Sequence, residues 1–512
     1  MNDATEEPRR PLEIDVARAL KPGKPYGIVD IGSNSVRLVV YDQLGRAPLP
    51  RFNEKSLCRL GDGLAQTGAI APDNFRRAVE SVRRFHAIAD AMGVERLDVT
   101  ATEAMRRASN GGALAAALEK DAGVRVRVLS GAEEARFSTL GVISGFFRPV
   151  GLVGDMGGGS LELCEAKDDR PGDQWASLPL GALPVEAMLA EGANVAKRAI
   201  DEILDRELPT AFRPKVFYAV GGGWRALAKA HIAAVLAPVP VVHGYTLAPA
   251  DARAFAKSIV RATPAKLRLM PGVVERRART LPAAAMMLDR VLKRLSPERV
   301  VFSALGLREG FIYAQLSEAE RYLDPLVEGA QLIGLPPARV AGFAPSLLPW
   351  TEPLFPDETP SQRRLRTAVC ALSDIAWRDH PELRAEESFR RLLRFPFIGV
   401  THAERVFLAA AIHSRYAGRP DAPWLTPALG LLTPAERRRA LVLGRAILLG
   451  YRLSGGVAAV LAGAKLNVAG ETLRVEVTPA ARVPDSEVVG DRLRLLAAAL
   501  GTTRSEIIER AA

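Results

Sequence analysis

The chain has 512 residues, of which 48% are hydrophobic and 25% charged, values that exclude a fibrous or intrinsically disordered class. It carries 69 Lys and Arg against 58 Asp and Glu, a net charge of +11, which favours a polyanionic partner: nucleic acid, an anionic membrane or polyphosphate. Cys58, Cys164 and Cys370 form no CxxC pair, so the sequence predicts a reducing compartment and neither a disulfide framework nor a zinc site.

The N-terminus and the apolar runs bear on location. Residues 1–25 contain charges and prolines in place of the apolar run of a secretory signal, and we expect a mobile tail there. No uninterrupted apolar stretch reaches the roughly 20 residues that span a bilayer. The sequence therefore predicts a cytoplasmic protein without a membrane partner, divided into three or four domains.

The first organised stretch is Tyr26–Tyr41. A hydrophobic strand ends at Asp30, a turn of small residues follows over 32–35, and a second apolar strand covers Val36–Val40. This pattern predicts a strand, a tight turn and a strand, with a carboxylate at the start of the turn.

Two strands and two helices are expected next. Helix-spaced apolar residues predict a helix over Pro72–Met92, and strands are expected at Arg96–Ala101 and Val124–Leu129. The second strand ends at SGAEEAR, where Glu133 and Glu134 open a helix. Carboxylates at a helix start are favoured by the helix dipole, and this explains at least one of the two.

Val153–Glu165 has the same plan as the first stretch. Asp155 ends a strand, three glycines and Ser160 form the turn, and Glu162 lies on the strand face opposite its leucine neighbours. Glycine amides can approach an anion closely, and a carboxylate at each edge makes sense if a divalent cation is also held there. The alternative is a hairpin turn that merely requires a positive φ.

The two stretches are related by position. They lie about 125 residues apart, which predicts two similar half-domains facing each other. A third glycine turn, Ala219–Arg225, follows a strand-like run at Val216–Val220 and precedes a helical pattern. The N-terminal dipole of that helix would add to the amides of the turn.

Seven segments carry a resemblance to a known family. DIGSNSVRL, ATEAMRRASN, SGAEEAR, DMGGGSLEL, LPLGA, GGGWRALA and SALGLREG occur in this order between Tyr26 and Tyr313, and together they resemble the exopolyphosphatase and guanosine pentaphosphate phosphohydrolase family. That family belongs to the sugar-kinase, actin and chaperone-ATPase superfamily. The resemblance implies an α/β fold with two actin-like (ribonuclease H-like) half-domains around a cleft, followed by a mostly α-helical C-terminal region. The expected domains are 26–130 with a returning helix near 306–316, 131–305, and 317–512.

The resemblance also implies site residues. Glu134, with Glu133 as the alternative, is expected to be the general base that accepts a proton from the attacking water. Asp30, Asp155 and Glu162 are expected to hold Mg²⁺, with Mn²⁺ as the alternative, because oxygen ligands and phosphate suit a small hard cation. The expected phosphate-binding residues are Ser33, Asn34, Ser35, Arg106, Gly157, Gly158, Gly159, Ser160, Gly222, Gly223 and Arg308. For Arg308, an ion pair with Glu309 within the protein is the alternative.

Proline-rich connectors after Ser317 separate helical runs. In long family members this region resembles the metal-dependent His-Asp phosphohydrolase fold, but Ser373 and Asp374 stand here where a His-Asp pair is expected. Too few nitrogen ligands remain for a metal site, so we predict a structural module that shapes a polyanion channel or a dimer interface. A hairpin is expected over 464–478 and a helix over Ser486–Leu500.

The function implied by the resemblance is an exopolyphosphatase that releases terminal orthophosphate from inorganic polyphosphate as a homodimer, with guanosine pentaphosphate as the alternative substrate. A non-catalytic phosphate or nucleotide sensor is a second class, and four acidic site residues argue against it. A kinase is a weaker third possibility on the same fold. Aromatic residues make up only 6% of the chain and no aromatic-and-basic consensus is present, so nucleic acid is not expected as a partner.

Overall fold

The computed structural model describes residues 12–209, 212–479 and 486–509. The chain folds as two compact units: an N-terminal unit of residues 23–321, and a C-terminal unit in which residues 322–512 are joined by residues 1–22. The N-terminal unit contains both expected half-domains.

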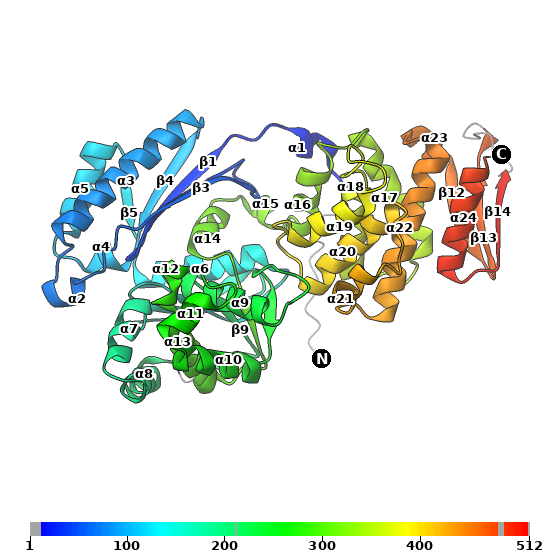
Figure 1. Ribbon diagram of the computed structural model, residues 1–512. Helices are drawn as coiled ribbons and strands as arrows, with labels where there is room; N and C mark the ends of the chain where they lie inside the picture. The colour runs from blue at the N-terminus through cyan, green and yellow to red at the C-terminus, as the bar shows by residue number, and fades with distance from the viewer. Residues whose placement is uncertain (1–11, 210–211, 480–485, 510–512) are drawn as a thin grey trace. The chain divides into compact units, whose positions relative to one another are not determined.

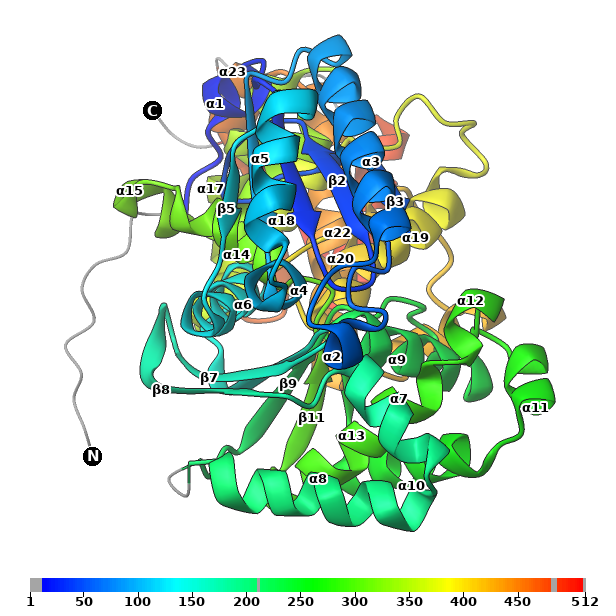
Figure 2. The same cartoon turned by 90° about the vertical axis from the view of Figure 1, so that its left-hand side faces the viewer.

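The first half of the N-terminal unit is a five-stranded sheet in the order β3-β2-β1-β4-β5. β1 pairs antiparallel with β2 and parallel with β4. Helices α3 and α5 cover one face of this sheet (Figure 2). The elements are β1 Tyr26–Ile31, β2 Val36–Tyr41, β3 Pro50–Ser56, α2 Leu64–Thr67, α3 Pro72–Ala91, β4 Arg96–Ala101, α4 Glu103–Arg107, α5 Gly111–Ala122 and β5 Val126–Val128.

The second half repeats this plan in a six-stranded sheet, β10-β11-β9-β6-β7-β8. Read from its other edge, β8, β7, β6, β9 and β11 take the places of β3, β2, β1, β4 and β5, with the same parallel and antiparallel pairings. The elements are α6 Gly131–Gly145, β6 Val150–Met156, β7 Leu161–Lys167, β8 Arg170–Leu178, α7 Ala182–Ala190, α8 Ala193–Glu207, β9 Val216–Val220, α9 Gly222–Ala234, β10 Tyr245–Leu247, α10 Pro249–Arg261, α11 Pro264–Leu269, α12 Glu275–Ala278, α13 Leu281–Leu295, β11 Arg299–Phe302, α14 Leu307–Ala314 and α15 Glu318–Arg321. The predicted pair of similar half-domains is therefore present.

Helices α6 and α14 lie between the two sheets (Figure 1). Their apolar side chains share one core with alternate residues of β1 and β2 and with β9 of the second sheet. The helices cross closely because both carry glycine at the contact: a Cβ on Gly310 would lie 1.7 Å from the Phe137 carbonyl oxygen, and one on Gly141 would lie 2.1 Å from that of Gly306. This contact holds the second half of α6, the helix at whose start Glu133 and Glu134 lie.

The C-terminal unit is mostly helical, with a small sheet at its end (yellow to red in Figure 1). The predicted hairpin is confirmed as β12 and β13, and β14 pairs in parallel with β13. The elements are α1 Val16–Leu20, α16 Pro325–Gly334, η1 Ala341–Ser346, α17 Leu347–Thr351, η2 Glu352–Leu354, α18 Pro360–Leu372, α19 Arg384–Arg394, α20 His402–Arg415, η3 Pro423–Leu425, α21 Thr426–Leu429, α22 Pro434–Ser454, α23 Ala458–Ala462, β12 Ala464–Ala469, β13 Thr472–Val477, α24 Glu487–Leu500 and β14 Arg504–Glu509.

Part of the predicted mobile tail is ordered. Val16–Leu20 forms α1, which Asp15 caps, and Arg18 makes an ion pair with Glu328 of α16. The expected tail therefore does not include this segment, and residues 1–11 lie outside the described residues. No helix in the described ranges is long and apolar enough to cross a membrane.

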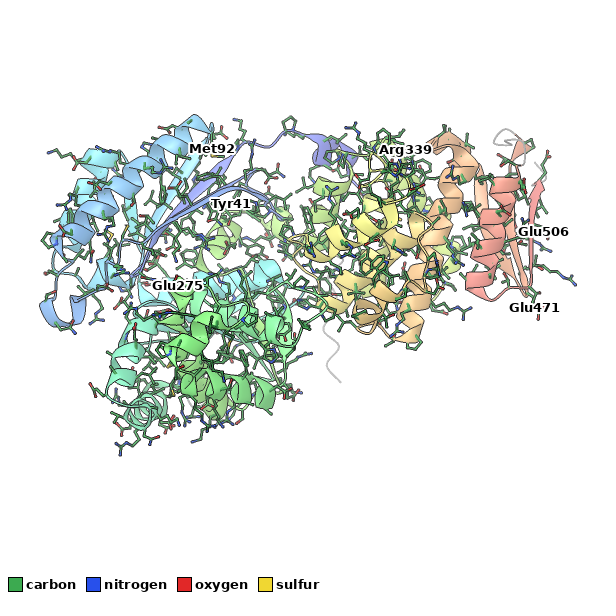
Figure 3. The ribbon with its side chains drawn as sticks, in the orientation of Figure 1. Tyr41, Met92, Glu275, Arg339, Glu471 and Glu506 are labelled. Carbon is green, nitrogen blue, oxygen red and sulfur yellow. The ribbon has the colours of Figure 1, made fainter. Side chains whose placement is uncertain are left out.

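Ser373 and Asp374 stand where an intact metal site would carry a His-Asp pair. The Asp374 carboxylate is only 2% exposed and accepts two hydrogen bonds from the Arg339 guanidinium, at 2.9 and 2.8 Å, and one from Arg415 at 3.4 Å (Arg339 is labelled in Figure 3). The neighbouring Ser373 hydroxyl lies 3.1 Å from the Tyr451 hydroxyl. Guanidinium groups thus neutralise the carboxylate that a metal ion would otherwise balance, which supports a structural role for this module.

Candidate active site

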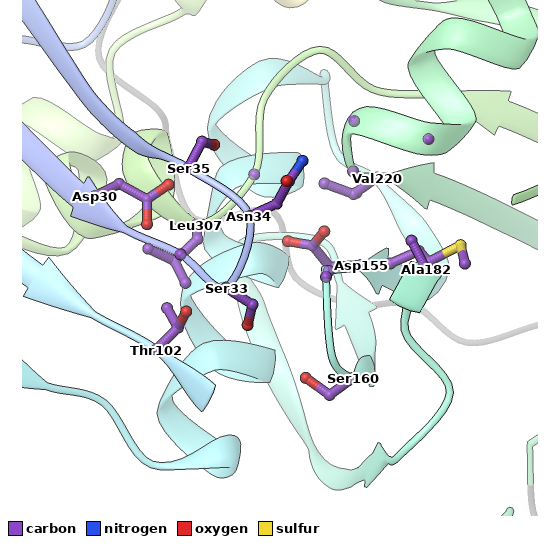
Figure 4. Close-up of a pocket in the computed structure, with 18 of the residues that line it drawn as sticks. Asp30, Ser33, Asn34, Ser35, Thr102, Asp155, Ser160, Ala182, Val220 and Leu307 are labelled. Carbon is purple, nitrogen blue, oxygen red and sulfur yellow. The ribbon is translucent and has the colours of Figure 1, made fainter. Parts of the chain in front are cut away.

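The three glycine and serine turns of the N-terminal unit meet at one cavity of about 210 Å³. Figure 4 shows Asp30, Ser33 and Asn34 approaching from the first half-domain and Asp155 and Ser160 from the second. The predicted site residues that line the cavity are Asp30, Ser33, Asn34, Ser35, Glu134, Asp155, Gly157, Gly158, Gly159, Ser160, Glu162, Gly222, Gly223 and Arg308. Folding therefore brings together residues spread over almost 280 positions of the sequence.

The first two turns have the same internal hydrogen bond. The amides of Gly32 and Gly157 each donate to the carbonyl of the serine three residues later, at 3.0 and 2.9 Å. The charges beside the turns differ, because Asp30 pairs with Arg37 across its hairpin whereas Asp155 pairs with Glu162. The second turn is therefore the more acidic of the two.

Glycine is needed in the second turn for space. None of the three glycines has a φ in the left-handed region, so the alternative of a turn that merely requires positive φ does not apply. A Cβ on Gly158 would lie 2.9 Å from the Ser33 Cβ, and one on Gly159 would lie 2.1 Å from the Glu103 Oε2. The carbonyls of the three glycines accept amides from the start of α7. The turn thus presses closely against the first half-domain.

The third turn precedes α9, as predicted, and brings two arginines to the cavity. A Cβ on Gly222 would lie 2.6 Å from the Arg277 Nη2, so that guanidinium lies directly against the turn. The Arg225 guanidinium donates to the Ala304 carbonyl oxygen at 2.7 Å, and its burial lowers its pKa to about 10. Both side chains line the cavity and supply positive charge beside the amides.

The two glutamates at the start of α6 have different surroundings. Glu133 completes the capping box with Ser130 and makes an ion pair with Arg127 at 2.6 Å, so its carboxylate serves the helix end. Glu134 is 6% exposed, lines the cavity and accepts a hydrogen bond from Arg106. Burial raises the pKa of Glu134 to about 7, and the Arg106 guanidinium opposes this rise. The position and the pKa of Glu134 suit a general base near neutral pH.

Arg106 is the one predicted phosphate-binding residue outside the cavity lining. Its guanidinium donates to Glu134 and to the carbonyl oxygen of Leu129. In the described structure Arg106 therefore holds the Glu134 carboxylate, and its predicted contact with phosphate stays a prediction.

The predicted metal ligands differ in exposure and in partners: Glu162 is buried, and Asp30 and Asp155 are partly exposed. Asp155 accepts a hydrogen bond from Ser138, and Glu162 accepts one from Ser177 at 3.2 Å. Burial raises the pKa of Asp155 and raises that of Glu162 well above its usual range. Asp30 instead accepts a hydrogen bond from Arg308 at 3.0 Å, so a predicted metal ligand and a predicted phosphate-binding residue contact each other.

The oxygen atoms of these three carboxylates are ligands of the kind that a hard divalent cation prefers, but the three groups are not gathered around one point. Within residues 12–209, 212–479 and 486–509, no three Asp, Glu, His or Cys side chains form a group that could hold a metal ion. The paired strands nevertheless place Asp155 and Glu162 opposite each other, and their raised pKa values reflect buried negative charge that a cation would offset.

Sequence reasoning missed several cavity residues. Glu103, Arg225 and Arg277 line the cavity, as do Arg37 and Lys55 of the first half-domain. Two of them carried a signal: Glu103 opens the helix that also holds Arg106, and Arg225 ends the third glycine segment, two residues after Gly223. Arg277 carried none, because α12 is a four-residue helix reached by a loop.

Comparison with known proteins agrees with this geometry. Residues 39–319 match the model of the Ppx/GppA phosphatase family, and residues 326–508 match that of the exopolyphosphatase C-terminal domain. The chain is 31% identical over 308 residues to exopolyphosphatase 1 of Mycobacterium leprae, covering 57% of this chain and 90% of that protein. It is 25% identical over 375 residues to a guanosine-5'-triphosphate,3'-diphosphate pyrophosphatase of Pseudoalteromonas translucida, covering 70% of this chain and 73% of that protein.

Solved structures resemble more than half of the chain. A crystal structure of the Aquifex aeolicus Ppx/GppA family member has a TM-score of 0.50 at 25% identity and covers 57% of this chain and 97% of its own. A crystal structure of an exopolyphosphatase-like protein has a TM-score of 0.51 at 25% identity and covers 57% of this chain and 98% of its own. With its repeated actin-like halves, its shared cavity and a family match over more than half of its length, this chain belongs to the Ppx/GppA phosphatase family.

Proposed function

We propose that this protein is an exopolyphosphatase, a hydrolase that releases terminal orthophosphate from inorganic polyphosphate in the cavity of its N-terminal unit. The observation that carries the proposal is the environment of Glu134: a buried carboxylate with a pKa of about 7, in a cavity lined by three turns suited to phosphate. In the proposed reaction Glu134 orients a water and accepts its proton while that water attacks the terminal phosphorus.

The cavity offers two kinds of groups to a phosphate chain. The turn residues bring backbone amides and the serine hydroxyls of positions 35 and 160, and Arg225, Arg277 and Arg308 bring guanidinium groups. Asp155 and Glu162 would hold Mg²⁺, which would stabilise negative charge on the phosphate oxygens when bound. Asp30 joins this set only if Arg308 turns from it to the substrate.

The distribution of charge supports a long polyanion as the substrate. The N-terminal unit has 41 Lys and Arg against 33 Asp and Glu, a surplus of 8, whereas the C-terminal unit has 28 against 25, a surplus of 3. Residues 251–300 contain 12 Lys and Arg against four Asp and Glu, and four of these arginines, at positions 253, 279, 290 and 294, make ion pairs within the unit. Lys266 and Arg268 of α11 are exposed there, and the next helix, α12, brings Arg277 to the cavity. We therefore expect this segment to contact the distal part of a chain, in place of the polyanion channel that the sequence predicts in the C-terminal module.

Guanosine pentaphosphate is the second candidate substrate. The match to the pyrophosphatase of Pseudoalteromonas translucida extends over 375 residues and favours keeping it. The homodimer, the cytoplasmic location and the absence of nucleic acid and membrane partners stay predictions.

The test compares orthophosphate release from long-chain polyphosphate and from guanosine pentaphosphate by the purified full chain, with Mg²⁺ present. The proposal expects faster release from polyphosphate. Release from guanosine pentaphosphate alone would assign the second candidate, and release from neither would refute hydrolysis as the function.

A further inference from the structure

Glu103 is a buried carboxylate at the meeting point of the two half-domains. It opens the short helix α4 at the end of β4, is 7% exposed and lines the cavity. Its Oε1 accepts a hydrogen bond from Arg107 at 2.7 Å, and its Oε2 accepts one from the Ser33 hydroxyl at 3.0 Å. Arg107 balances its charge, so the carboxylate is held in place and partly neutralised beside a site for anions.

The contact with Glu103 fixes what the Ser33 hydroxyl can offer. A hydroxyl has one proton to donate and two lone pairs with which to accept. The ionised Glu103 can only accept, so Ser33 gives it that proton. The Ser33 oxygen can therefore offer only lone pairs to a ligand in the cavity. Lone pairs suit a cation or a metal-bound water, but they do not suit a phosphate oxygen, which needs a donor.

Glu103 also forms the surface on which the second turn rests. The position that a Cβ would occupy on Gly159 lies 2.1 Å from the Glu103 Oε2 and 2.5 Å from its Cδ. A side chain at position 159 would therefore have to displace the carboxylate that holds Ser33. One residue thus links the hydroxyl of the first turn to the seating of the second.

We propose that Glu103 is a positioning residue that makes Ser33 an acceptor towards the cation side of the site and seats Gly159 against it. The proposal rests on the proposed function and changes one part of it: phosphate binds to the amides and arginines, and Ser33 faces the cation. Glu103 itself touches neither substrate nor water in this account.

The first test asks whether the Ser33 hydroxyl acts as an acceptor or as a donor towards the ligand. It measures the shift in the thermal unfolding temperature of the full chain with Mg²⁺ alone and with orthophosphate alone. Ser33→Ala and Glu103→Gln should each raise the Mg²⁺ concentration for a half-maximal shift about tenfold or more, and the double variant should be no worse than either single one. The glutamine keeps the shape beside Gly159 but can donate to Ser33 and reverse its hydroxyl. The orthophosphate concentration required should not change.

The matched control is Glu119→Gln, an exposed glutamate of the same half-domain. Alone it should leave both shifts at their wild-type values, and in combination with Ser33→Ala it should add nothing to the effect of Ser33→Ala. Loss of the orthophosphate shift in Ser33→Ala would assign Ser33 as a phosphate donor and overturn the proposal. Additive effects of Ser33→Ala and Glu103→Gln would also overturn it. These readouts do not depend on turnover, so a protein that hydrolyses no polyphosphate would refute the proposed function and leave this test valid.

The second test addresses the seating of Gly159. Gly159→Ala should lower kcat for polyphosphate about 100-fold, and adding Glu103→Ala, which removes the obstructing carboxylate, should restore at least tenfold of that loss. Gly112→Ala is the control glycine, because nothing lies within 4 Å of the position of its Cβ, and it should keep normal turnover. If Glu103→Ala makes Gly159→Ala worse, or if Gly159→Ala has normal kcat, the proposed seat is wrong.

Discussion

Replacing Glu134 by Gln should lower activity and raise stability at the same time. A carboxylate that accepts the proton of the attacking water cannot be replaced by an amide, so kcat for phosphate release should fall on the order of 10²–10⁴-fold while polyphosphate still binds. This combination is expected of a residue selected for function, because such a residue is often unfavourable for the folded state.

The size of the stability gain follows from the pKa of Glu134. The pKa lies at about 7 instead of 4.5, and one pKa unit corresponds to about 1.4 kcal/mol. Because the pKa of this acid is raised by folding, the ionised form costs stability as the pH rises from 4.5 through 7. At pH 8 and without metal, Glu134→Gln should therefore raise the free energy of unfolding by at most about 3 kcal/mol. At pH 4 the two proteins should be equally stable, because both side chains are neutral.

Urea unfolding at the two pH values, together with a steady-state phosphate-release assay, measures both quantities. Glu133→Ala is the matched control: it should lower stability by about 1 kcal/mol through loss of the capping box and leave kcat unchanged. Near-normal turnover of Glu134→Gln combined with inactivity of Glu133→Ala would exchange the two roles. Lower stability of Glu134→Gln at pH 8 would contradict the energetic argument.

Three further predictions concern other parts of the chain. Asp155→Asn should raise the Mg²⁺ concentration needed for half-maximal phosphate release by tenfold or more, and an unchanged metal requirement would exclude Asp155 as a ligand. Asp374→Ala should lower the free energy of unfolding by about 3 kcal/mol, because the buried Arg415 guanidinium loses its counter-charge and the exposed Arg339 loses its partner; a calorimetric Tm equal to that of the wild type would refute this. Arg268→Glu should weaken the binding of long polyphosphate and reduce the salt dependence of that binding, whereas Arg391→Glu in the C-terminal unit should do neither. Equal effects of the two variants in a binding titration across a salt series would contradict the assignment of the polyphosphate contacts to residues 251–300.

Local patterns were sufficient for much of the fold. The helix over Pro72–Ala91 could be predicted because its apolar residues recur every three or four positions, and the hairpin at 464–478 because its residues alternate around a glycine turn. The two related halves could be predicted because each turn repeats an aspartate, small residues and an apolar strand.

Side-chain partners depend on distant parts of the chain and could not be predicted in this way. The pairing of Asp30 with Arg308 joins residues 278 positions apart, and no local pattern indicates it. The contact of Gly159 with Glu103 requires the close approach of two half-domains. The arginines around Asp374 come from separate segments of the chain. The glycine turn itself was found, but the reason for its glycines is close packing and not a positive φ.

The measurement that tests the account most directly is orthophosphate release from long-chain polyphosphate by the wild type and by Glu134→Gln, at pH 8 with saturating Mg²⁺. The account predicts steady release by the wild type and a rate at least 100-fold lower for Glu134→Gln, with polyphosphate binding retained. Equal rates for the two proteins would show that the buried carboxylate of the cavity is not the base, and the assignment of the active site would be wrong.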